Sequence, residues 1–141
     1  MRRTPLGCRA IVIHCIDYRF VTPLRTYLDG LGLRGEYDDV GVAGGVKDLL
    51  GADETVKAYL LGQIEMARRL HGVSEVYLVN HLDCGAYGGQ SAFADEQAEQ
   101  EKHRDDLAEA ATVISSAFSD LTVHTLLGRI DRDGQVSFEV L

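Results

Sequence analysis

Runs of hydrophobic residues alternate along the chain with segments in which hydrophobic positions recur every three or four residues. The continuous apolar run at 9–15 (RAIVIHC) is typical of a strand covered on both faces. The segment 53–72 instead shows helical spacing and ends at a glycine, which favours a helix C-terminus. The predicted strands are 9–15, 37–43, 74–80, 121–130 and 135–141, and the predicted helices run from Thr22-Pro23 to about Gly30, from Asp53 or Glu54 to His71, and from Asp95 to Phe118.

This alternation predicts an α/β fold of three layers, in which a mainly parallel sheet carries helices on both faces. We expect the first four strands in the order 2-1-3-4. The segment 135–141 should return after the turn at 131–134 as an antiparallel edge strand. The length of 141 residues suits one domain, so we expect residues 1–141 to form a single one.

The net charge of −8 disfavours nucleic acid and anionic membranes as partners, since both select a basic surface. Much of the acidic charge lies between Asp95 and Glu109, which we interpret as a solvated helix face. No apolar run approaches the roughly 20 residues of a membrane helix. The basic segment 1–7 lacks the long apolar stretch of a signal peptide, so we expect a cytoplasmic protein.

Two groups of chemically active residues fall where predicted strands end. Cys15, Asp17 and Arg19 follow the first strand, and His81 and Cys84 follow the third, at the start of the glycine-rich loop. Open parallel sheets bind ligands at the carboxyl ends of their strands. With the strand order 2-1-3-4, the two groups would face each other across one crevice.

The chain has three cysteines, an odd number that favours buried, catalytic or metal-bound thiols over a disulfide framework. Cys15, His81 and Cys84 form a ligand set suited to zinc, and we expect one Zn²⁺ per chain. Three protein ligands leave one tetrahedral position open, as in catalytic zinc sites, where the pKa of bound water falls to near ~7. Cys8 matches no motif and is interpreted as structural or close to solvent, and His71 is interpreted as a helix C-terminal residue.

Asp17 and Arg19 would lie on the same side of an extended strand and could therefore pair. A carboxylate beside zinc either closes the fourth position or bonds to the guanidinium and accepts a hydrogen bond from metal-bound water. Arg19 favours the second state through a bidentate grip. Two simpler readings stay open: Asp17 as the cap of the following turn, and Arg19 in a surface ion pair worth ~0–1 kcal/mol.

At these residues the sequence resembles the β-class carbonic anhydrases, whose signature combines C-x-D-x-R with a later H-x-x-C-G. The two motifs stand here as Cys15-Ile16-Asp17-Tyr18-Arg19 and His81-Leu82-Asp83-Cys84-Gly85. The resemblance implies a zinc enzyme that reversibly hydrates carbon dioxide to bicarbonate by hydroxide generated at the metal. It also implies that Cys15, His81 and Cys84 are the metal ligands, that Asp17 and Arg19 gate the fourth position, and that the chain forms a homodimer or a higher homo-oligomer.

The substrate pocket departs from the family pattern. Tyr18 stands where the family commonly has serine, and the segment 41–45 (GVAGG) keeps only two positions of an R-N-A-G-N-like stretch. Backbone N–H groups of Gly44, Gly45 and Gly85 are candidates for binding the product oxyanion.

Two alternatives to carbon dioxide hydration stay open. Related proteins with this site act on carbonyl sulfide or carbon disulfide, so a zinc hydrolase of such a small molecule is one. The other is a non-catalytic, zinc-stabilised binding module with Asp17 permanently on the metal. No proton shuttle stands out: His14 and His103 are candidates only as histidines, and His103 is expected to face solvent.

Overall fold

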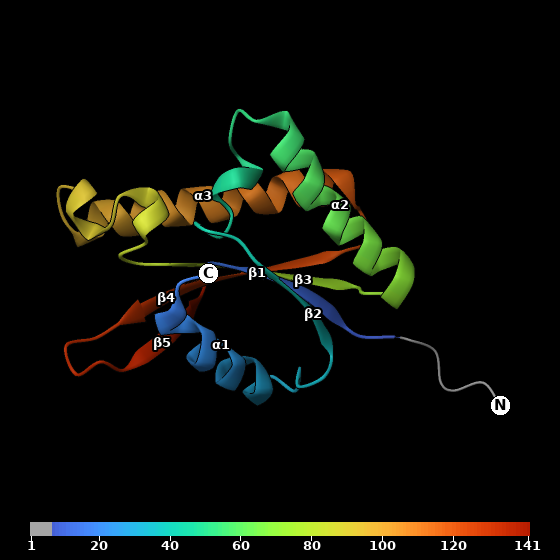
Figure 1. The fold of residues 1–141 in the computed structure, drawn as a ribbon, viewed down its shortest axis with the longest axis horizontal. Helices are drawn as coiled ribbons and strands as arrows, with labels where there is room; N and C mark the ends of the chain where they lie inside the picture. The colour runs from blue at the N-terminus through green and yellow to red at the C-terminus, as the bar shows by residue number, and fades with distance from the viewer. Residues whose placement is uncertain (1–6) are drawn as a thin grey trace.

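The structure, a computed structural model that describes residues 7–141, is built around one five-stranded sheet (Figure 1). The strand order is β2-β1-β3-β4-β5, and only the β4–β5 pair is antiparallel. The α/β fold class, the strand order and the antiparallel edge strand are therefore confirmed. The strands are β1 (Ala10–His14), β2 (Tyr37–Gly41), β3 (Glu75–His81), β4 (Thr122–Ile130) and β5 (Val136–Val140).

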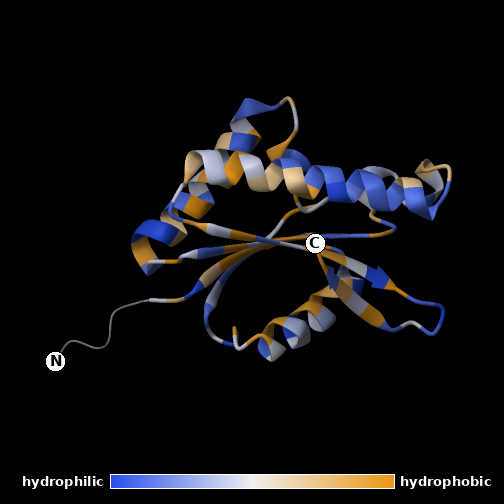
Figure 2. Ribbon diagram, turned by 180° about the vertical axis from the view of Figure 1, so that it is seen from behind, coloured by the Kyte–Doolittle hydropathy of each residue, from blue (hydrophilic) through white to orange (hydrophobic). Residues whose placement is uncertain are grey.

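Helices cover both faces of this sheet, with α1 (Tyr18–Gly30) on one side and both α2 (Glu54–His71) and α3 (Glu96–Ala117) on the other (Figure 1). All five residues of β1 are buried. Ile11 and Ile13 pack into the cluster with α2 and α3, whereas Ala10 and Val12 pack with α1. Successive side chains of a strand point to opposite faces, which is why a continuous apolar run suits this central position. Figure 2 shows the sheet between its two helical layers, with the ribbon coloured by hydropathy.

The described part of the chain also has three short 3-10 helices, at Lys47–Leu49 (η1), Gly85–Tyr87 (η2) and Gln90–Ala92 (η3). Within residues 7–141, no helix has the length and apolarity required to span a bilayer. The basic segment considered for a signal peptide lies mostly outside the described residues.

The start of α1 differs from the prediction. The helix begins at Tyr18 instead of at Thr22-Pro23, and Pro23 lies inside it. Asp17 is the N-cap, and its side chain accepts a hydrogen bond from the backbone N–H of Arg19. The cap satisfies a backbone donor that the first turn leaves free, and it starts the helix one turn early. Arg19 is therefore on the first turn of a helix and not on an extended strand.

The acidic segment at the start of α3 also differs from the expected solvated face. Glu99, His103 and Asp106 are buried, with exposed fractions of 2%, 0% and 7%. The expectation that His103 faces solvent was wrong. These residues share one face of α3, and the partners that make their burial tolerable come from β3 and the loop after it, which composition could not reveal.

Candidate metal centre

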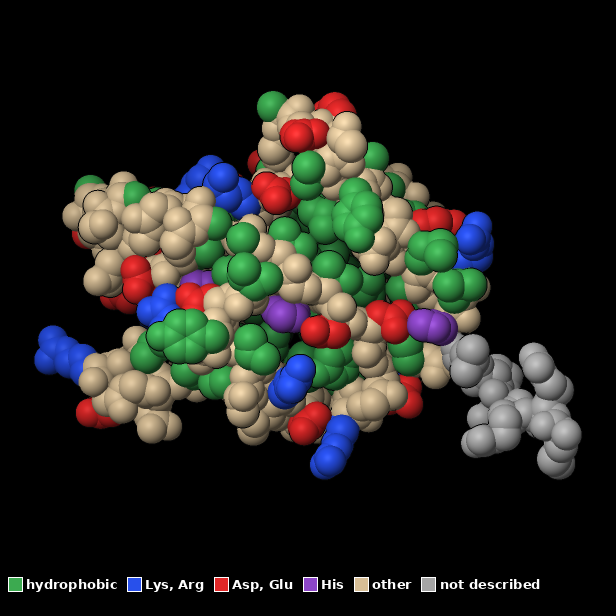
Figure 3. Space-filling model, viewed as in Figure 1, with side chains coloured by type: hydrophobic (Ala, Val, Ile, Leu, Met, Phe, Trp, Pro, Cys, Tyr) green, Lys and Arg blue, Asp and Glu red, His purple; other side chains and the backbone are tan. Residues whose placement is uncertain are grey.

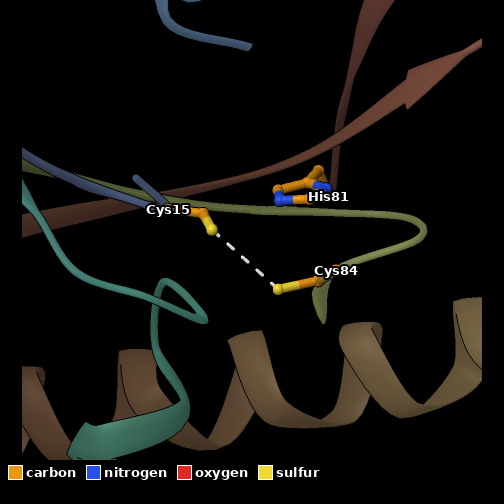
Figure 4. A group of neighbouring side chains, drawn as sticks. All are labelled: Cys15, His81 and Cys84. Atoms are coloured by element: carbon orange, nitrogen blue, oxygen red, sulfur yellow. Dashed lines mark hydrogen bonds between the residues drawn. The ribbon is translucent and has the colours of Figure 1, made fainter. Parts of the chain in front are cut away.

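The three predicted metal ligands come together at the carboxyl ends of two neighbouring strands. Cys15 directly follows β1, His81 is the last residue of β3, and Cys84 lies in the loop after it. Because β1 and β3 pair in parallel, with His14 opposite Val79, these ends meet at one edge of the sheet. All three side chains are buried, and they point toward one another (Figure 4).

The distances between the ligand atoms suit a tetrahedral ion. The two sulfur atoms are 3.9 Å apart, both cysteines are free thiols, and all three ligand atoms lie within 4.8 Å of one another. Two thiolates that each lie ~2.3 Å from one tetrahedral zinc ion would be about 3.8 Å apart. The site is thus preorganised for such an ion without a large movement of the two cysteines.

One ring nitrogen of His81 is left available. Nδ1–H donates to the backbone carbonyl of Leu82 at 2.7 Å, which leaves the lone pair on Nε2. Nε2 is buried and has no hydrogen-bond partner within the described residues. The ring also stacks on Phe20, with 4.2 Å between the ring centroids. A buried, unpartnered acceptor beside two thiols fits a metal ligand, whereas without a ligand it would be an uncompensated polar group.

The two thiols share one hydrogen bond. The Cys84 thiol, acting as donor, lowers the pKa of Cys15, and the same contact raises the pKa of Cys84. Backbone N–H groups of Gly44 and Ala86 also stabilise the Cys15 and Cys84 thiolates, respectively. Such donors favour the charged sulfur that a metal requires.

Asp17 and Arg19 form a closely bonded pair beside this centre. Asp17 Oδ1 accepts from Arg19 N at 2.9 Å and from Nε at 3.1 Å, and Oδ2 accepts from Nη2 at 2.7 Å. The side-chain hydrogen bonds from Arg19 are the main cause that lowers the pKa of Asp17. Asp17 Oδ2 lies 3.7 Å from Nε2 of His81. The helix cap and the ion pair, considered as alternatives above, are thus present together.

Asp83 and Glu99 stabilise the loop that carries Cys84. The sequence did not indicate this role for either residue. Asp83 has a positive φ of 57°, which is uncommon for a residue with a side chain. Arg19 donates to its carbonyl oxygen at 3.0 Å and to its Oδ2 at 3.2 Å, and Oε2 of Glu99 accepts from its backbone N–H at 2.6 Å. No motif marks Glu99, because it lies within an acidic stretch of α3.

A buried polar network lies behind the ligands. Nδ2 of Asn80 donates to Nδ1 of His103 at 2.9 Å and to the hydroxyl of Tyr87 at 3.2 Å, and that hydroxyl donates to Asp106 at 2.7 Å. Burial, followed by the nearby His81, lowers the pKa of His103 to about 4. His103 is therefore neutral at pH 7 and enclosed, which does not suit a proton carrier in contact with solvent.

A pocket of about 530 Å³ opens beside Cys15 and Asp17, and its lining includes Tyr18, Gly44 and Gly85. Tyr18 is 85% exposed, at the pocket rim. Gly44 and Gly85 therefore line the same pocket as Cys15 and Asp17.

Gly45 does not line this pocket. It has a positive φ of 62°, and a Cβ there would come within 2.6 Å of the backbone carbonyl of Val79. Its place in the structure explains why a glycine is required: the backbone passes very close to the end of β3.

A comparison with known families matches residues 7–138 to the model described as "Putative carbonic anhydrase". The chain belongs to this carbonic anhydrase family. Two uncharacterised proteins from Rickettsia species are similar in sequence: that of Rickettsia bellii is 26% identical over 86% of this chain and 76% of its own length. That of Rickettsia conorii is 26% identical over 92% of this chain and 72% of its own.

Solved carbonic anhydrases share the fold of this family member. Isoform I from Trichomonas vaginalis has a TM-score of 0.61 at 17% identity, covering 99% of this chain and 86% of that one. The carbonic anhydrase of Streptococcus mutans has a TM-score of 0.54 at 20% identity, covering 98% and 86%. A tetrameric β-carbonic anhydrase from Sordaria macrospora has a TM-score of 0.58 at 17% identity, covering 94% and 80%.

Proposed function

We propose that this family member is a zinc-dependent carbonic anhydrase that interconverts carbon dioxide and bicarbonate. The observation that carries the proposal is the set of two free sulfur atoms 3.9 Å apart beside a buried imidazole nitrogen without a partner. Cys15, His81 and Cys84 would hold the ion. When bound, zinc acts as a Lewis acid that makes hydroxide available near neutral pH.

Asp17 and Arg19 would then control the open position. Because Arg19 already engages both carboxylate oxygens, this pairing would hold Asp17 away from direct ligation and leave a lone pair for the attacking water. As an anion at neutral pH, Asp17 can only accept a hydrogen bond, so it would select the orientation in which an oxygen lone pair faces the substrate carbon.

After the attack on carbon dioxide, the site must release bicarbonate and a proton. Carbon dioxide and water give bicarbonate and one proton, so the pocket must release an anion as well as a proton. The backbone N–H of Gly85, a residue that lines the pocket, would stabilise the developing oxyanion, whereas the N–H of Gly44 is already bonded to the Cys15 sulfur. Arg19 adds positive charge on the same side.

Stopped-flow hydration of carbon dioxide tests this function. The zinc-loaded wild-type chain should be active, and Cys84→Ser should lose the zinc ion of this centre together with the activity. Asp17→Asn should keep zinc and lose activity by on the order of 10²-fold, since it loses the anionic acceptor. Glu101→Ala, exposed on α3 and outside both clusters of metal-binding side chains, is the control and should match the wild type. A zinc-loaded, folded wild type that hydrates no carbon dioxide would contradict the proposal.

The same assay with carbonyl sulfide and carbon disulfide addresses the two sulfur substrates. Turnover of either in place of carbon dioxide would assign a zinc hydrolase. Zinc-dependent folding without turnover of any of the three would support a non-catalytic module.

We also propose that the chain forms a homodimer or a higher homo-oligomer. Ile16 and Tyr18, beside the pocket, are 61% and 85% exposed, which is unusual for large apolar side chains next to a site. Further hydrophobic side chains reach the surface between charged ones on the face drawn in Figure 3. The similar protein from Sordaria macrospora is tetrameric, which supports the proposal.

A further inference from the structure

A second group of metal-binding side chains lies away from the candidate metal centre. Cys8 precedes β1, Asp38 is in β2, and His71 ends α2. One ligand atom from each lies within 4.8 Å of the other two. From the sequence, Cys8 is interpreted as structural or close to solvent and His71 as a helix C-terminal residue, because no motif joins them.

Backbone contacts hold the three residues in place. The N–H of Cys8 donates to the carbonyl oxygen of His71 at 3.0 Å, which ties the start of β1 to the end of α2. Asp38 pairs in register with Ile11 of β1. Its Oδ2 lies 2.7 Å from Nδ1 of His71. The end of α2 and the starts of β1 and β2 lie on the same side of the molecule (Figure 1).

We propose that Cys8, Asp38 and His71 bind a divalent ion of the zinc class. A thiolate, an imidazole and a carboxylate are donors that zinc accepts together, and their two negative charges balance a divalent cation. The side chains of Asp38 and His71 are 31% and 35% exposed, so an ion and a completing water molecule can enter from solvent. The ligand atoms need only small adjustments, since tetrahedral nitrogen and oxygen ligands of zinc lie about 3.3 Å apart.

This second site is independent of the first. Cys8 and Cys15 flank opposite ends of β1, so the strand separates the two sites by roughly 20 Å. Filling the second site would clamp the start of β1, the start of β2 and the end of α2. It therefore stabilises the fold instead of taking part in the reaction.

The number of zinc ions per chain tests the proposal. At saturating zinc, after removal of weakly bound metal, the wild-type chain should hold two ions, and Cys8→Ala and His71→Ala should hold one. His124→Ala is the matched control, because His124 pairs with Glu75 at 2.9 Å but belongs to neither group of clustered ligands. It should still hold two. Cys84→Ser should retain the second ion, which separates this proposal from the assigned function.

A second measurement needs no variant. Zinc should slow the alkylation of Cys8 by iodoacetamide several-fold in the intact wild-type chain, as read by peptide mass spectrometry. A single zinc ion in the saturated wild type, or two ions in Cys8→Ala, would overturn the proposal. Unchanged alkylation of Cys8 at saturating zinc would do the same.

Discussion

His81 connects the candidate metal centre to the surrounding fold through one tautomer. Its Nδ1–H donates to a backbone carbonyl that cannot change its role, so the free lone pair must be on Nε2. Phe20 stacks on the ring, and Gly128 leaves room for Phe20, since a Cβ at 128 would come within 3.0 Å of its ring. The ligand is therefore oriented before any metal arrives.

Glu99 gives a prediction at the residue scale. Glu99→Ala should weaken zinc binding by ~10–100-fold, because it removes the acceptor that holds the backbone of Asp83 between two ligands. Glu99→Gln should retain most of the affinity, since its amide oxygen can accept the same bond. Competition with a chelator of known affinity measures the change. Glu101→Ala, exposed on the same helix, should match the wild type, and equal affinity in Glu99→Ala would refute this positioning role.

His103 gives a second prediction, on pH. Its pKa in the folded chain is about 4, below the ordinary value near 6.5, so the unfolded chain binds more protons between these values. Stability should therefore be lost as the pH falls from about 6.5 toward 4, with a slope approaching about 1.4 kcal/mol per pH unit from this group.

Urea unfolding at several pH values measures that slope. His103→Gln keeps hydrogen-bonding capacity toward Asn80 and has no titrating group, so its stability should fall less between pH 6.5 and 5. An identical pH dependence in the wild type and His103→Gln would contradict this role for His103.

At the scale of elements, the strand patterns were sufficient to predict where the metal ligands meet. The apolar run before Cys15 and the one before His81 predicted two buried parallel strands, and the carboxyl ends of such strands share an edge. The start of α1 was harder to predict. Proline is common at the first helical position, which favoured a start near Pro23, whereas Asp17 belonged to the predicted site. The same carboxylate of Asp17 caps the helix and pairs with Arg19. A sequence motif cannot distinguish these two roles.

The cap of α1 leads to a prediction about this element. Asp17→Ala should destabilise the chain by about 1 kcal/mol through loss of the cap, whereas Asp17→Ser should restore much of the stability without restoring activity. Denaturant unfolding and carbon dioxide hydration, measured on the same variants, separate the two roles. Full activity in Asp17→Ser would contradict the catalytic role proposed for the carboxylate.

The buried face of α3 shows what the sequence could not predict. Glu99, His103 and Asp106 read as part of an acidic, solvated helix, yet each is buried. Their partners lie on β3 and in the loop after it, so only the folded chain makes their burial favourable. Composition gives the average polarity of a helix and does not indicate which of its residues pack against the sheet.

At the scale of the whole molecule, assembly can be tested without reference to activity. We expect an oligomer in solution by mass photometry. Tyr18→Glu should shift the distribution toward monomer, since it places a charge on an exposed apolar side chain beside the pocket. Tyr59→Glu, at a tyrosine 65% exposed on α2, is the control and should leave the mass unchanged. A monomeric wild type, or an unchanged mass for Tyr18→Glu, would contradict this assignment.

The candidate metal centre and the proposed second metal site lie at opposite ends of the parallel strands. The carboxyl edge of the sheet carries the candidate centre and the pocket, and its amino edge carries the proposed second site, which would stabilise the same strands. The centre depends on three side chains that only the parallel β1–β3 pairing brings together.

Anomalous diffraction at the zinc edge, from crystals of the zinc-loaded chain, tests the central claim most directly. We predict a peak about 2.3 Å from Sγ of Cys15 and Cys84 and about 2.1 Å from Nε2 of His81, with Asp17 still bonded to Arg19. Absence of zinc between the two sulfur atoms, or a carboxylate oxygen of Asp17 in the fourth position, would contradict the account.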